Sequence, residues 1–218
     1  MTYTGDVSVG GNADVRELPA LVISKLAVGP YNNNAYLLRC TTTGAQVLVD
    51  AAAEPERLLD LVGDEGLTAV VTTHAHGDHW GALVSVVAAT GARTIAHADD
   101  ARDIAAVIDE TVQDGATIRV GDIELTTIHL VGHTPGSIAL LYDDPTGPPH
   151  LFTGDCLFPG GVGNTWKDPD RFDTLYAGVV SRLFDRLPDE TWVYPGHGGD
   201  TTLGAERPHL AEWRERGW

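Results

Sequence analysis

The chain has 218 residues and a mass of 23.2 kDa, and its formal net charge at pH 7 is -17. A chain of this length can bury one substantial core, so we expect a single domain over residues 1–218, in which residues 1–19 form a loosely ordered N-terminal segment. The negative charge disfavours nucleic acids and anionic membranes as partners, and no apolar run approaches the roughly 18 residues of a membrane span. Residues 1–18 lack the charged start and apolar core of a signal peptide. We therefore expect a cytoplasmic protein with small-molecule ligands, whose oligomeric state the composition leaves open.

The first half of the chain alternates extended and helical patterns. Runs rich in apolar and β-branched residues, separated by Gly, Pro and Asn, predict strands at residues 21–28, 35–39, 46–50, 67–72 and 93–96. Helical spacing of apolar residues predicts helices at residues 54–62, 80–90 and 99–108.

The second half of the chain also contains both extended and helical patterns. Strands are predicted at residues 117–120, 123–131, 137–142, 150–152 and 191–194, and the first two are joined by a hairpin signal at Gly121-Asp122. Helices are predicted at residues 172–187 and 206–216, with Pro208 near the start of the second. The order of these elements predicts a layered α/β fold.

A dense group of metal-ligand residues directly follows the strand predicted at residues 67–72. His74 and His76 alternate in an extended segment, so both side chains point the same way and can converge on one ion. Gly77 then allows a sharp change of direction. Asp78 and His79 come next, and in the first turn of a helix they project about 100° apart, so one or both can face a second ion. Four potential ligands at this density predict a metal site.

Three more candidate ligands each end an apolar run and each follow a glycine: His133, Asp155 and His197. Ligands at the ends of several strands can meet along one sheet edge, and a preceding glycine lets the backbone approach a metal centre closely. We assign His74, His76 and His133 to a first ion, Asp78, His79 and His197 to a second, and Asp155 to a bridge between them.

The order His-x-His-x-Asp-His, Gly-His, Gly-Asp and Gly-His resembles that of the metallo-β-lactamase superfamily, and within it the glyoxalase II-like hydrolases. The resemblance extends over residues 21–210, and residues 153–158 and 195–206 look like those of short bacterial members. It implies an α/β fold, namely a four-layer αββα sandwich, with two metal ions in a cleft at one edge. Flavodiiron members carry Glu at the position of His76, and true β-lactamases lack the aspartate present here as Asp155. The resemblance therefore favours hydrolysis of a small molecule.

The loop at residues 158–170 departs from the nearest relatives. Glyoxalase II and the persulfide dioxygenases place a basic residue where this chain has Asn164, and that residue helps to hold glutathione. Only 21 residues follow His197, which is too few for the C-terminal helical region with which classical glyoxalase II holds the same thiol. A glutathione thioester substrate is therefore in doubt, although Trp166 and Lys167 offer partial substitutes.

The ligand set indicates hydrolysis by hydroxide held between two divalent ions. Zinc is favoured because it lowers the pKa of bound water to about 7, while iron and manganese suit the same imidazole and carboxylate ligands. The expected substrate is a thioester or a related ester or lactone, and Asp78 is the candidate for orienting the nucleophile or moving its proton.

Two alternatives stay open: a mononuclear iron persulfide dioxygenase, and a non-catalytic binding protein stabilised by metal. The remaining histidines, namely His97, His129, His150 and His209, are interpreted as surface or structural residues. Cys40 and Cys156 are expected to be free thiols.

Overall fold

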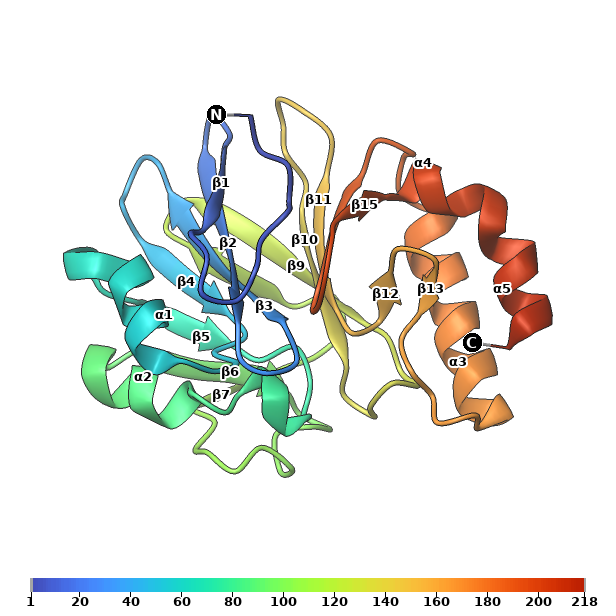
Figure 1. Cartoon of the computed structure of the whole chain (residues 1–218), viewed down its shortest axis with the longest axis horizontal. Coiled ribbons are helices and arrows are strands. Elements are labelled where there is room, and N and C mark those ends of the chain that lie inside the picture. The colour runs from blue at the N-terminus through green and yellow to red at the C-terminus, as the bar shows by residue number, and fades with distance from the viewer. Residues whose placement is uncertain (1, 218) are drawn as a thin grey trace.

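The computed structural model describes residues 2–217, and it forms two mixed β-sheets packed face to face between two layers of helices (Figure 1). This is the αββα arrangement of the predicted fold class. The first sheet runs in chain order, namely β1 (Asp14–Glu17), β2 (Leu21–Val28), β3 (Asn33–Cys40), β4 (Gln46–Val49), β5 (Ala69–Val71), β6 (Arg93–His97) and β7 (Glu110–Val112). The first four strands pair antiparallel, and β4 to β7 pair parallel. Helices α1 (Pro55–Val62) and α2 (Leu83–Thr90) cover its outer face.

The second sheet is antiparallel except at one pair. Its order is β15 (Thr201–Thr202), β14 (Trp192–Pro195), β11 (His150–Gly154), β10 (Ile138–Tyr142), β9 (Ile123–His129) and β8 (Thr117–Val120), and β11 pairs parallel with β14. A small hairpin of β12 (Leu157–Phe158) and β13 (Gly161–Val162) stands apart. The outer face is covered by α3 (Pro169–Val179) with a following π-helical turn (Val180–Phe184), and by α4 (Leu203–Glu206) and α5 (Leu210–Arg216).

Alternation along the strands creates three apolar cores. In β3, Tyr36 and Leu38 point into the space between the sheets, whereas Ala35 and Leu37 point towards α1 and α2. The central core joins side chains of both sheets, and burial of one such leucine stabilises the fold by roughly 2 kcal/mol. This shared core supports the single-domain organisation of residues 1–218, which we keep as a proposal.

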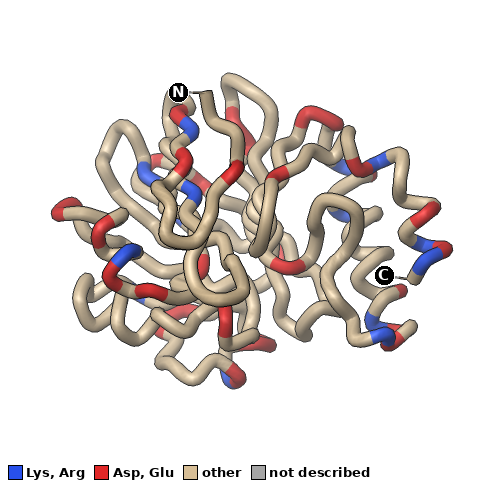
Figure 2. Tube along the Cα trace, viewed as in Figure 1, with Lys and Arg blue, Asp and Glu red and all other residues tan. Residues whose placement is uncertain are grey.

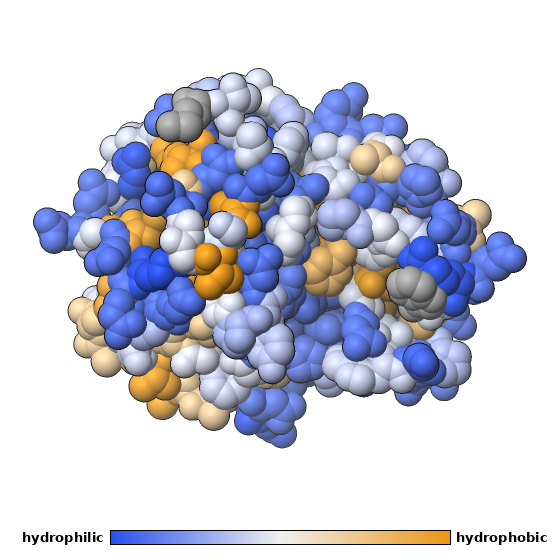
Figure 3. All heavy atoms as spheres, viewed as in Figure 1, coloured by the Kyte–Doolittle hydropathy of each residue, from blue (hydrophilic) through white to orange (hydrophobic). Residues whose placement is uncertain are grey.

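The distribution of charged and hydrophilic residues agrees with the acidic composition of the chain. Acidic positions are spread over both halves of the molecule (Figure 2), and hydrophilic side chains dominate the face shown in Figure 3. Within residues 2–217 no helix is both long enough and apolar enough to cross a bilayer. Cys40 and Cys156 are buried free thiols.

Several elements differ from the sequence-based expectations. Residues 99–108 form turns and not a helix, because the buried Asp100 side chain accepts hydrogen bonds from the backbone N–H of Ala75 (2.8 Å) and Gly136 (2.6 Å) and fixes the start of the segment. Asp78 and His79 lie in a 3-10 turn (Gly77–His79), and α2 begins only at Leu83. The C-terminal helix is split by a 3-10 turn (Arg207–His209) at Pro208, which has no N–H to donate.

The N-terminal segment is also different from the expected loose chain. Residues 14–17 pair as β1 with β2, and Tyr3 packs against the central core. Strands β1 and β7 were not predicted, because short edge strands with mostly exposed side chains carry little apolar signal.

Candidate metal centre

The seven predicted ligands meet where strands of both sheets end. His74 and His76 follow β5, and Asp78 and His79 lie in the 3-10 turn beyond them. From the second sheet, His133 follows β9, while Asp155 and His197 follow the neighbouring parallel strands β11 and β14. Parallel pairing brings the carboxyl ends of two strands to the same edge, which explains why residues so far apart in sequence become neighbours.

The side chains form two adjacent clusters. In the first, one ligand atom each from His74, His76 and His133 lies within 4.8 Å of the others, and Nε2 of His74 lies 3.3 Å from Nε2 of His133. In the second, made of Asp78, His79 and His197, Nε2 of His79 lies 3.2 Å from Nε2 of His197. The first cluster is a set of three converging nitrogen donors, and the second combines two nitrogen donors with a carboxylate oxygen.

Asp155 lies between the clusters. Its Oδ2 is 3.6 Å from Nε2 of His133 and 3.5 Å from Nε2 of His197, and its Oδ1 is 3.3 Å from Nε2 of His79. Oδ1 is buried and has no hydrogen-bond partner among the described residues. An unsatisfied buried carboxylate oxygen beside imidazole nitrogens that face one another fits divalent cations, because a cation compensates all of these donors at once.

Each histidine that faces the centre through Nε2 has a polar partner at Nδ1. This is the pattern of metal-binding imidazoles, since the partner fixes the tautomer and the ring orientation. The partners are Asp50 Oδ2 for His79 (2.7 Å), Thr73 Oγ1 for His74 (3.1 Å), the Asn164 carbonyl for His133 (2.9 Å) and the Tyr31 carbonyl for His197 (2.9 Å). Asn33 Nδ2 donates to Oδ2 of Asp78 at 2.9 Å.

The sequence pattern did not predict a role at the centre for Asp50, Thr73 or Asn33. Asp50 did carry a signal, because it directly follows a buried strand, as the assigned ligands do, although no glycine precedes it. Its side chain also accepts from the backbone N–H (2.8 Å) and hydroxyl (2.8 Å) of Thr73, so it fixes the start of the histidine motif.

Burial sets the protonation states of the first cluster. It lowers the pKa of His74 well below the usual value and that of His133 to about 4, so both imidazoles are neutral at pH 7 and can offer a lone pair. Burial opposes the charged form of Asp155 less than its contacts with His197 and His79 favour it, so the pKa of that carboxyl lies well below its usual range.

The second cluster carries a proton. Burial opposes the charged form of His79, but Asp50 and Asp155 together raise its pKa to about 10. A cation that takes Nε2 of His79 at neutral pH must therefore displace a proton, which makes binding pH-dependent.

Gly196 is required by close approach. A Cβ atom at this position would lie 2.8 Å from Cε1 of His79 and would overlap Oδ1 of Asp155. No side chain fits between the two clusters at this point, so the glycine before His197 has the role predicted for it.

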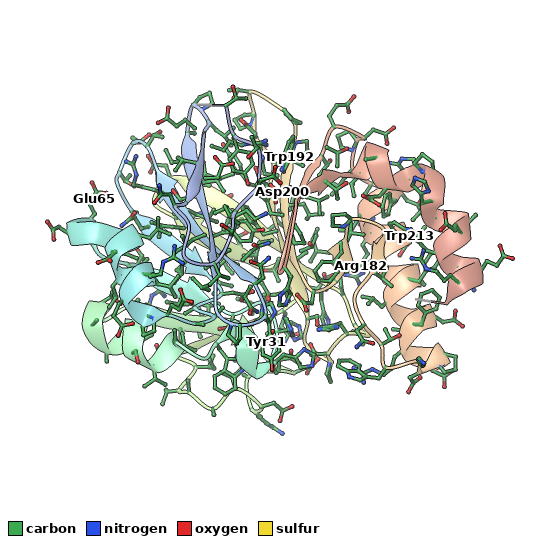
Figure 4. The ribbon with its side chains drawn as sticks, in the orientation of Figure 1. Tyr31, Glu65, Arg182, Trp192, Asp200 and Trp213 are labelled. Atoms are coloured by element: carbon green, nitrogen blue, oxygen red, sulfur yellow. The ribbon has the colours of Figure 1, made fainter. Side chains whose placement is uncertain are left out.

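Two exposed aromatic residues, Tyr31 and Trp166, lie beside the metal centre on its solvent-exposed side, which we call its entrance. Tyr31, which is labelled in Figure 4, lies in the β2–β3 loop and is 70% exposed. Its carbonyl contacts Nδ1 of His197. Trp166 is 50% exposed and its ring stacks on His133 at a centroid distance of 5.4 Å. The guanidinium of Arg171 lies 4.4 Å from the same indole ring, and Arg171 also donates to the carbonyl of Gly132 at 2.8 Å. The loop at residues 158–170, which carries Trp166, therefore contacts the metal centre.

The other histidines lie outside this centre. His97 and His129 stack face to face at 3.8 Å, and Asp99 lies close enough to complete a further group of possible ligands. Stacked rings direct their lone pairs into parallel planes, unlike the converging nitrogens of the centre, so we keep the structural interpretation. His150 is buried against Tyr194, and His209 is exposed.

The fold and the site define a class: an αββα sandwich with a histidine- and aspartate-rich centre at one sheet edge. The chain belongs to the metallo-β-lactamase superfamily, whose sequence profile matches residues 28–197.

The relatives include hydrolases and an uncharacterised protein. A hydroxyacylglutathione hydrolase of Polaromonas sp. is 39% identical over 181 residues, which cover 81% of this chain and 66% of the relative. The chain thus spans only 62 to 66% of the length of three hydroxyacylglutathione hydrolases to which it is similar. An uncharacterised protein of Aquifex aeolicus is 32% identical over 86% of this chain and 94% of its own length.

Two solved structures have the same fold. TTHA1623 in a di-iron-bound form is 34% identical with a TM-score of 0.69, over 84% of this chain and 96% of that one. ETHE1 from Myxococcus xanthus is 29% identical with a TM-score of 0.75, over 88% and 84% respectively.

Proposed function

We propose that the protein is a metal-dependent hydrolase that cleaves a small-molecule thioester, or a related ester or lactone, at a centre of two divalent ions. The observation that carries the proposal is the position of Asp155 between two clusters of three donors each. The proposed ligands are His74, His76 and His133 for one ion, Asp78, His79 and His197 for the other, and Asp155 for both. Similarity to hydroxyacylglutathione hydrolases supports the reaction class.

In the proposed reaction the metal ions, Asp78 and Asn33 have different roles. Divalent ions at such a centre lower the pKa of water to about 7 and polarise a carbonyl group. Asp78, whose side chain is 30% exposed, is the carboxylate at the entrance that can orient the nucleophile or accept its proton. Asn33 holds one oxygen of Asp78, which leaves the other available.

The residue at position 164 is not suited to hold glutathione. Asn164 offers no positive charge, and its Oδ1 accepts a hydrogen bond from the backbone N–H of Trp166 at 2.8 Å. The side chain is therefore engaged within its own loop. We propose that the thiol part of the substrate is held by Trp166 and Lys167.

A persulfide dioxygenase with a single iron is the second candidate, and the similarity to ETHE1 from Myxococcus xanthus is the observation that favours it. Two zinc ions per chain would support the hydrolase, whereas one iron with consumption of oxygen would support the dioxygenase. Zinc is our preferred metal, with iron and manganese as the other candidates.

We also propose a cytoplasmic location, which the two free thiols support.

The test combines metal analysis with activity. We expect about two metal ions per chain in protein purified without chelator, and turnover of thioesters that disappears on chelation and returns with metal. Asp78→Asn should lower turnover by at least about 100-fold, the usual effect of removing a general acid or base. Asp64→Asn, at an exposed site in the 3-10 turn after α1, is the matched control and should leave turnover unchanged. Thioester hydrolysis that survives both chelation and Asp78→Asn would contradict the proposal.

A further inference from the structure

A completely buried lysine lies next to the loop that carries His197. Lys25 of β2 has a side-chain exposure of 0%, and its Nζ donates to the carbonyl of Gly5 (2.7 Å), the carbonyl of Gly198 (2.7 Å) and Oδ1 of Asp200 (2.6 Å). An ammonium group has three hydrogens to donate, so all of them are used. Burial of an unpaired ammonium is strongly unfavourable, so these three acceptors must stay in place around Lys25.

Asp200 extends the network to the N-terminal segment. Its Oδ2 accepts from the hydroxyl of Tyr3 (2.7 Å) and from Nε1 of Trp192 (2.9 Å), and Figure 4 shows Asp200 beside Trp192. A Cβ atom on Gly5 would lie 2.6 Å from the same oxygen, so the segment packs tightly on the carboxylate. The side chain of Asp200 is 2% exposed.

The backbone around His197 is held on both sides by side chains of β2 and β3. The Pro195 carbonyl accepts from Asn34 Nδ2 (2.9 Å) and from the hydroxyl of Tyr36 (2.6 Å). The Gly198 carbonyl accepts from Lys25 and from Asn34 Nδ2 (2.9 Å). His197 itself is 24% exposed, and its Nδ1 contacts only a backbone carbonyl, so its position depends on the backbone on either side.

We propose that Lys25 is a positioning residue for the second metal ion: with Asp200 and the N-terminal segment, it fixes the loop after His197 so that His197 faces Asp78 and His79. This inference rests on the proposed two-metal centre. Tyr3, Gly5, Lys25 and Asp200 all lie outside residues 28–197, which match the superfamily. The device therefore belongs to the parts of this chain that the shared profile does not include.

The test measures the two zinc affinities separately, by titrating metal-free protein against a competing chelator. Lys25→Met should weaken the second zinc ion by about 10- to 100-fold, the usual effect of removing a group that orients a ligand, and should leave the first unchanged. Leu183→Ala, in the π-helical turn that follows α3 and buried in the outer core, controls for a general loss of stability and should leave both affinities unchanged. If Lys25→Met does not fold, Lys25→Met/Asp200→Asn removes the buried charge pair together, and the same selective weakening is expected.

The outcomes separate the two proposals. Two ions in the wild type and unchanged affinities in the folded Lys25 variant would overturn the positioning role alone, even if the variant unfolds more easily. A wild type that binds one ion or none would overturn the two-metal function, and this inference with it.

Discussion

Single atoms decide whether the two clusters can form. The glycine at position 196 and the carboxylate of Asp50 are both within contact of His79, one by leaving space and the other by bonding to Nδ1. The sequence pattern predicted this glycine, as it predicted the seven candidate ligands, but it did not predict the role of Asp50. It could not predict the Tyr31 and Asn164 carbonyls, because every residue has a carbonyl and only the folded backbone selects one.

Gly196→Ala should therefore disrupt the centre. We expect loss of metal binding together with a lower free energy of unfolding, because the new methyl group overlaps Asp155 and approaches Cε1 of His79. Metal content and denaturant unfolding measure both effects. Gly199→Ala is the matched control, since no atom lies within 4 Å of a Cβ there, and it should change neither quantity. Equal metal content in the two variants would show that the space at Gly196 is not needed.

Elements with a strong period were predictable, and elements defined by contacts were not. The strand at Leu21–Val28 and the hairpin strand at Thr117–Val120 match their predicted bounds. The expected helix at residues 99–108 failed because local propensity was overridden by the tertiary bonds of Asp100, and β12 and β13 are too short to leave a pattern. Helix α3 was predicted, but its start at Pro169 was missed by three residues, although Asp168 and Pro169 are typical of a helix start.

That start supports the metal centre indirectly. The Asp168 side chain accepts from the backbone N–H of Asp170 (3.0 Å) and Arg171 (3.1 Å), and Arg171 in turn contacts the backbone at His133. Asp168→Ala should lower the free energy of unfolding by about 1 kcal/mol through loss of this cap. Asp173→Ala, on an exposed turn of the same helix, loses only a 3.6 Å surface ion pair and should cost clearly less. Equal chemical denaturation curves for the two variants would contradict the capping role.

At the scale of the whole molecule, the two sheets share one core, and that core contains titratable groups. His150 of β11 is 1% exposed, with Nδ1 2.9 Å from the Tyr194 hydroxyl and Nε2 without a partner among the described residues. Burial and the nearby Arg16 lower the pKa of His150 to about 4. The folded protein therefore holds this imidazole neutral at a pH where the unfolded chain is protonated.

This linkage predicts acid sensitivity. Between about pH 6.5 and pH 4 the unfolded state binds the extra proton, so the contribution of His150 to stability is present above this range and is lost as the pH falls. Between pH 7 and pH 5 the loss should be about 2 kcal/mol. His150→Asn should remove most of that difference in unfolding experiments on metal-free protein. The exposed His209→Asn should keep the wild-type pH dependence, and an unchanged slope in His150→Asn would disprove the assignment.

The burial of Lys25 has a practical consequence for chemical labelling. The sequence contains only two lysines, and the other one, Lys167, is exposed and next to Trp166 at the entrance of the metal centre. An amine-reactive fluorophore applied to the folded protein would therefore find a single accessible lysine side chain. Its emission would report on events at the entrance without the introduction of a new cysteine.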